Sequence, residues 1–134
     1  MDELVEWLGA QLDEDERIAR AAGGDAWRRQ EHASDTVAIY DSKGEPVVYD
    51  EGWPTEEQRA HIAAYDPARV LREIDAKRRV LRDLASAEVA LRATEPGRGP
   101  HELMTGATNS WRAVVKVLAA VYADRPGYLA EWRP

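Results

Sequence analysis

Residues 66–82 read DPARVLREIDAKRRVLR and decide the fold, because they combine a helix start, an apolar face and clustered basic residues. Asp66 is a residue type that caps helices, and Pro67 suits the first helical position. A helix is therefore predicted from Pro67 to about residue 93, and it should be the longest element. Its apolar side carries Val70, Ile74, Leu81, Leu84 and Leu91.

Two further helices are predicted upstream of this stretch. Residues 2–22 place their apolar side chains within one arc of a helix and end at Gly23 and Gly24. The sequence TEEQ at residues 55–58 fits a capping box, which opens a short helix that runs through Tyr65.

Between these helices lie two runs of β-branched and aromatic residues, TVAIYD at 36–41 and PVVYDE at 46–51. Gly44 in the connection suits the left-handed position of a hairpin loop, so a two-stranded antiparallel hairpin is predicted. A lone hairpin is marginally stable in water, so one of its faces should rest on helices. That face is either Val37 with Ile39 or Val47 with Tyr49.

The C-terminal third is predicted as a linker, a short helix and a buried helix. Residues 94–100, TEPGRGP, carry two prolines and two glycines, and Gly106 should break the chain after a short helix at 101–104. The helix at 111–123 has few charges, so it is expected to be the most buried element. The whole chain, residues 1–134, is expected to form a single α+β domain, mostly helical. It should combine a bundle of three main helices and one short helix with the two-stranded hairpin.

Composition limits the range of functions. The chain has a net charge of −7 and no cysteine. Negative charge works against binding to nucleic acid, and the lack of cysteine excludes disulfides and thiolate metal sites. No apolar run reaches the roughly 18 residues of a membrane span, and the acidic N-terminus does not resemble a signal peptide. A cytoplasmic protein without membrane attachment is expected.

Three segments resemble a known family. They are HIAAYDPARVLREIDAKRRVL at 61–81, YADRPGYLAEWRP at 122–134 and LDEDERIARAA at 12–22. The family consists of small uncharacterised proteins from actinobacteria and their phages, and it is a domain of unknown function. The resemblance implies an intracellular protein of actinobacterial or phage origin and brings no catalytic residues.

Three polar residues form one candidate site. Asp15 and Lys77 lie on the apolar faces of their predicted helices, where an unpaired charge is costly. His61 lies in the predicted short helix. They could line a ligand pocket or form a structural network, and the structural interpretation is favoured. Asp15 and Lys77 are predicted to be coupled, directly or through His61, and a double-mutant cycle would show this coupling. No catalytic signature accompanies them, and the four consecutive acids at 13–16 spread around a helix, so no metal site and no cofactor are predicted.

The second candidate is a phosphate site formed by Arg72, Arg79 and Arg82 on the same helix. However, Glu73 lies four residues from both Arg69 and Lys77, and Arg79 lies four residues from both Asp75 and Asp83, which are ion-pair spacings. A self-neutralised helix surface is the favoured interpretation.

The third candidate is aromatic. The chain has five tryptophans and five tyrosines, residue types that are favoured at interfaces. Tyr49, Trp53, Tyr128 and Trp132 lie at the hairpin edge and in the tail, where they either cap the core or bind a partner. We favour a non-enzymatic interaction or regulatory protein that binds a protein partner or a second copy of itself. The alternative is a small hydrolase or ligand-binding protein that uses Asp15, His61 and Lys77.

Overall fold

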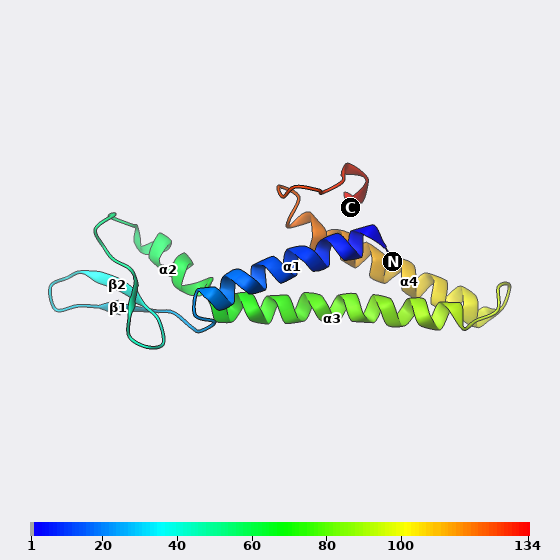
Figure 1. Cartoon of the computed structure of the whole chain (residues 1–134), viewed down its shortest axis with the longest axis horizontal. Coiled ribbons are helices and arrows are strands. Elements are labelled where there is room, and N and C mark those ends of the chain that lie inside the picture. The colour runs from blue at the N-terminus through cyan, green and yellow to red at the C-terminus, as the bar shows by residue number, and fades with distance from the viewer. Residues whose placement is uncertain (1) are drawn as a thin grey trace. The chain divides into compact units, whose positions relative to one another are not determined.

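The computed structural model describes residues 2–134, which form mostly helices and one small antiparallel sheet (Figure 1). The elements are α1 (Glu3–Ala21), β1 (Arg28–Glu31), β2 (Val37–Tyr40), β3 (Pro46–Val48), α2 (Glu56–Ala64), α3 (Pro67–Arg92), α4 (Gly99–Ala120) and the 3₁₀ turn η1 (Ala130–Trp132). The predicted mostly helical α+β class is confirmed.

The described residues divide into two compact units. The helical unit comprises residues 2–13 and 75–134, and the sheet unit comprises residues 14–74. Helices α1 and α3 each contribute residues to both units. The single domain expected from the sequence stays a prediction.

Side-chain caps start α2 and α3 as predicted. Thr55 and Gln58 form the reciprocal capping box of α2, with hydrogen bonds of 2.7 and 3.1 Å. At α3, Asp66 Oδ1 accepts a 2.8 Å hydrogen bond from the amide of Arg69, while Oδ2 accepts a 3.0 Å bond from the amide of Trp27. The buried Asp66 carboxylate therefore caps α3 and also fixes the segment that leads into β1.

The sheet corrects one prediction, because it has three strands in the order β1-β2-β3 and not two. The β2–β3 hairpin is present, with Gly44 at a φ of +82°. Strand β1 pairs antiparallel with β2 through residues 28–31, RRQE. All four residues are exposed, so this sequence shows no alternation of apolar and polar residues. Pairing of its backbone with β2 holds this edge strand in place. The strand therefore leaves no pattern in the sequence.

Of the two hairpin faces left open by the sequence, the one with Val37 and Ile39 is buried. Val47 and Tyr49 are exposed.

The helical unit has its core along α1, α3 and α4. Its buried apolar side chains are Leu4, Leu8, Leu12, Leu84, Val115, Ala119, Tyr122 and Trp132. Arg112 of α4 makes ion pairs with Glu88 of α3, at 2.9 Å, and with Asp2, which directly precedes α1. The tail closes over Trp7, whose indole Nε1 donates a 3.0 Å hydrogen bond to the carbonyl of Pro126.

Helix α4 differs from its prediction in two ways. It is continuous over Gly99–Ala120, so Gly106 does not break it and Pro100 lies inside it. Proline is tolerated in a first turn, where no amide donor is needed, and one glycine costs a helix only about 1 kcal/mol. The helix is also not the most buried element. Only Thr108, Val115 and Ala119 are buried along it, whereas β2 buries three of its four residues.

Candidate functional site

The sheet unit contains a groove beside β2 with a volume of about 530 Å³. Strand β2 contributes Val37 and Ala38, and the turn before it contributes His32 and Thr36. The segment after β3, residues 49–53, completes the lining with Tyr49, Asp50, Glu51 and Trp53. The groove thus combines buried apolar residues of a strand with exposed aromatic rings from a loop.

Trp53 is the most unusual residue of this groove. Its residue surface is 88% exposed, and its φ is +51°, a left-handed conformation that bulky residues rarely adopt. The backbone turn is closed by a 3.0 Å hydrogen bond from the Trp53 amide to the carbonyl of Asp50. The chain therefore holds a large apolar side chain in water in a backbone state that costs about 1 kcal/mol or more.

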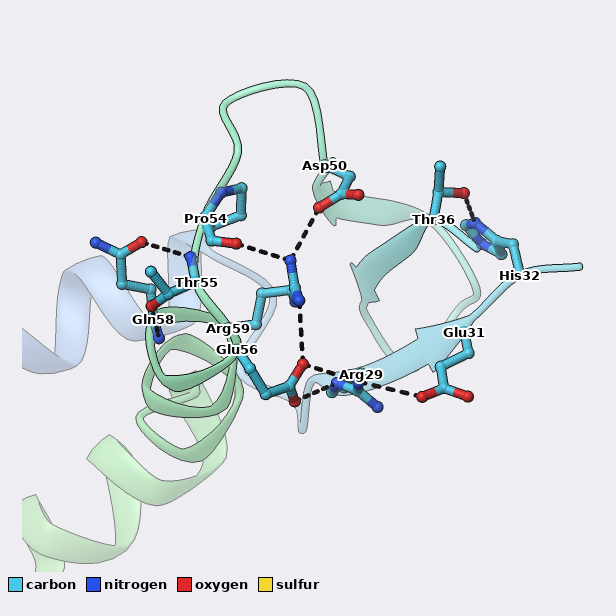
Figure 2. Close-up of polar contacts among 10 residues, drawn as sticks. All are labelled: Arg29, Glu31, His32, Thr36, Asp50, Pro54, Thr55, Glu56, Gln58 and Arg59. Carbon is cyan, nitrogen blue, oxygen red and sulfur yellow. Dashed lines mark hydrogen bonds and ion pairs between the residues drawn. The ribbon is translucent and has the colours of Figure 1, made fainter. Parts of the chain in front are cut away.

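Arg59 of α2 fixes the loop that carries Trp53. Its Nη1 donates hydrogen bonds to Asp50 Oδ1 at 2.9 Å and to the carbonyl of Pro54 at 2.8 Å. One guanidinium therefore binds both ends of the loop at residues 50–54. Figure 2 shows this guanidinium between Asp50 and Glu56. The Arg59 side chain is only 16% exposed, which protects these bonds from competition by water. The loop is thereby held in one geometry.

Glu56 links α2 to the sheet. Its carboxylate accepts bonds from Arg29 Nε at 2.7 Å and Arg29 Nη2 at 2.9 Å, and from Arg59 Nη2 at 3.1 Å (Figure 2). The hydrogen bonds from Arg29, and then those from Arg59, lower the pKa of Glu56, because they stabilise the ionised carboxylate. Charge-assisted bidentate contacts of this kind fix orientation. They hold β1 and α2 together next to the groove.

His32 forms a small polar cluster at another part of the lining. One ring nitrogen lies 3.0 Å from Thr36 Oγ1, and the other lies 2.7 Å from the Tyr40 hydroxyl. Because both nitrogens have partners, the ring is held in place and belongs to the structure of the β1–β2 turn.

The structure separates the four predicted aromatic residues. Tyr49 and Trp53 are exposed and line the groove. Tyr128 and Trp132 pack on Trp7 in the helical unit, with ring centroids 5.5 Å from the Trp7 ring in both cases. The latter pair therefore corresponds to the core-capping interpretation.

The three polar candidates are Asp15, His61 and Lys77. Asp15 lines a second pocket of the sheet unit, about 280 Å³ in volume, together with Trp27 and Tyr65. His61 does not line this pocket, but it stacks on Tyr65 with 4.4 Å between the ring centroids. Lys77 is in the helical unit, where its Nζ donates a 3.0 Å hydrogen bond to the hydroxyl of Tyr122. The coupling of Asp15 with Lys77 stays a prediction.

The phosphate candidates Arg72, Arg79 and Arg82 are all exposed along α3. Of the predicted ion-pair spacings, the one between Arg69 and Glu73 forms a bond of 3.0 Å. This bond raises the pKa of Arg69, because it favours the charged guanidinium.

The sequence singled out Tyr49 and Trp53, but not the polar residues that hold the groove in place. Glu56 and Arg59 stand at ion-pair spacing in the predicted short helix, and this was the one available signal. Arg29 could not be found because β1 was not predicted, and His32 lies in the turn that follows it.

The described residues show neither a cluster of metal ligands nor a membrane-spanning helix. Within residues 2–134 no group of three or more histidine, cysteine, aspartate or glutamate side chains could hold a metal ion. No helix in this part of the chain is long and apolar enough to cross a membrane.

Fold and site define a mostly helical α+β protein whose small antiparallel sheet carries an aromatic groove. The chain belongs to a family of unknown function, DUF6221, whose sequence profile matches residues 1–134. Comparisons with curated proteins and with solved structures give no match.

Proposed function

We propose that the protein is a non-enzymatic binding protein whose sheet unit captures an extended segment of a protein partner in the groove beside β2. Tyr49 and Trp53 form the aromatic contacts, and Val37 and Ala38 form the apolar base. This proposal rests on one observation above all, the exposed Trp53 on a loop that Arg59 holds in place.

An exposed tryptophan in a left-handed backbone is costly for an isolated protein, and its burial by a partner would recover apolar surface. A loop that is already ordered loses little entropy on binding, so more of the contact energy appears as affinity. Tryptophan and tyrosine also dominate the energetics of known interfaces. The exposed Trp53 ring and its ordered loop therefore favour a partner that covers the ring.

The charge of the groove indicates the chemistry of the partner segment. Asp50 is neutralised by Arg59, whereas Glu51 is exposed and has no ion pair among the described residues. A lysine or arginine of the partner could pair with Glu51 and stack on the Trp53 ring. The preferred segment therefore carries an apolar anchor next to a basic residue.

The alternative, a small-molecule pocket that includes Asp15, has less support. The pocket lined by Asp15 is about half the volume of the groove, and its lining includes neither His61 nor Lys77. A hydrolase would need acid, base or nucleophile side chains within hydrogen-bond reach of one another.

The proposal can be tested with a displayed library of random peptides of about a dozen residues, selected on the immobilised protein. Enriched peptides are expected to carry an apolar residue beside lysine or arginine. Their affinity, measured by fluorescence anisotropy, should fall at least about tenfold for Trp53→Ser and more weakly for Glu51→Gln.

The matched control is Ile18→Ser, which removes an exposed apolar side chain from the same unit but not from the groove. It should leave peptide affinity unchanged. If no peptide is enriched, or if enriched peptides bind Trp53→Ser as tightly as the wild type, the groove is not the binding site.

A further inference from the structure

Helix α4 and its C-cap residue, Val121, expose an apolar stripe that the helical unit does not cover. Leu103, Val117 and Val121 are 70%, 57% and 66% exposed, and Val114 is exposed as well. Large apolar side chains that stand singly on a surface need no explanation, but a contiguous row along one helix marks an interaction surface.

The spacing of this stripe is that of a helix pair. Six positions follow one another at alternating steps of four and three, which is the a and d pattern of a coiled-coil seam. At about 100° per residue they fall within an arc of about 80°, and the buried face of α4 lies outside this arc. The seam positions are Leu103, Ala107, Ser110, Val114, Val117 and Val121.

We propose that α4 pairs through this seam with α4 of a second copy of the chain, in an antiparallel arrangement about a two-fold axis near residue 112. The surface is then self-complementary, as a two-fold interface requires.

Side-chain volumes select the antiparallel direction. In a parallel pair each seam residue meets its own copy, so Ala107 and Ser110 would each form a layer too small to fill the space between the helices. In the antiparallel pair both of these small residues meet a valine. The resulting layers are Leu103 against Val121, Ala107 against Val117 and Ser110 against Val114.

The positions beside the seam also suit a second copy of the same helix. On the helix surface, neither the seam nor the row of positions on each side of it carries a charged residue. Two identical faces can therefore meet without like-charge repulsion. One flank carries Gly106, Ala113 and Ala120 at every seventh residue, and small side chains there allow the two backbones to approach closely. A partner with a charged face would have no counter-charge along this row.

The area that the seam can bury is modest for a protein interface. From Leu103 to Val121 the helix runs about 27 Å, and a band of about half its circumference offers on the order of 450 Å² per copy. Two copies bury roughly 900 Å², somewhat less than the 1,200 to 2,000 Å² that is typical of stable complexes. The dimer should therefore be reversible, so the fraction of paired chains should depend on protein concentration.

Sedimentation analysis across protein concentrations tests the pairing. The wild-type mass should rise from that of one copy toward that of two, and Val117→Lys should weaken association at least about tenfold. The matched control is Val89→Lys, because Val89 is 59% exposed but lies on α3, and this change should not affect association. A wild type that stays monomeric at hundreds of micromolar overturns the proposal, and so does association that Val117→Lys does not weaken.

Disulfide trapping tests the direction without relying on a charged variant. The chain has no cysteine, so Leu103→Cys and Val121→Cys each introduce a single thiol. A mixture of the two proteins should form the mixed disulfide faster than either homodisulfide, as judged by mass spectrometry. Faster formation of the Leu103→Cys homodisulfide would overturn the antiparallel arrangement. Peptide binding in the groove should be unaffected by Val117→Lys, so the two proposals can fail independently.

Discussion

Gly127 lies directly against the indole of Trp7. A Cβ atom added at Gly127 would stand 2.8 Å from Trp7 Nε1 and 3.2 Å from Cδ1, and the φ of Gly127 is +88°. The ring has little freedom to move away, because Nε1 donates a hydrogen bond to the carbonyl of Pro126. The closure of the tail over α1 therefore depends on a position that has no side chain.

Gly127→Ala should destabilise the helical unit by about 2–3 kcal/mol in urea unfolding, since left-handed strain and a steric clash add together. Gly97→Ala is the control, because Gly97 has a φ of +82° but nothing within 4 Å of the added atom. It should show the strain alone, about 1 kcal/mol. Equal losses for the two variants would show that the contact with Trp7 has no energetic weight.

Trp132→Ala should cost about 3 kcal/mol in the same measurement, because the side chain is buried and contacts both Trp7 and Tyr128. Removal of residues 128–134 should likewise lower the melting temperature by several degrees. The comparison is Trp53→Ala, which removes the same side chain from an exposed site and should change stability by less than about 0.5 kcal/mol. If both substitutions cost the same, the tail does not anchor the unit.

The sequence predicted those features that depend on local pattern. The caps at Thr55 and Asp66 could be found because each satisfies amides of its own helix a few residues ahead. Gly44 could be found because its hairpin needs a left-handed residue.

Features that depend on distant partners could not be predicted. Strand β1 has no apolar alternation and exists because its backbone pairs with β2. Arg59 acts on Asp50 and Pro54, and this contact requires the position of α2 relative to the loop. In α4, the low number of charged residues predicted burial within the chain. The same residue composition also fits an exposed face that binds another molecule.

Arg59→Met should loosen the groove loop while it keeps most of the aliphatic side chain. Amide exchange in residues 49–54, measured by mass spectrometry, should become faster, because Asp50 and the Pro54 carbonyl lose their shared donor. Global stability should fall by about 1–2 kcal/mol. Arg72→Met is the control, since Arg72 is exposed and has no ion pair among residues 2–134. Unchanged exchange at 49–54 would mean that Arg59 does not position Trp53.

Glu56 should make stability depend on pH. Its pKa is lowered in the folded chain by bonds first from Arg29 and then from Arg59, so the unfolded chain binds this proton more tightly. The stabilisation is therefore complete above the unfolded-state pKa of about 4.3 and is lost as the pH falls through the lower folded-state value. Glu56→Gln should lower the melting temperature by about 1–3 °C at neutral pH.

The difference in melting temperature between the wild type and Glu56→Gln should shrink as the pH falls below about 4, because the wild-type carboxyl is then also neutral. Melting curves between about pH 7 and pH 2 measure this convergence. Glu57→Gln is the matched control, since Glu57 is an exposed neighbour without an ion pair in the described part of the chain. A gap between Glu56→Gln and the wild type that stays constant with pH would contradict the prediction, because an effect of the ionised carboxylate has to disappear when that carboxylate is protonated.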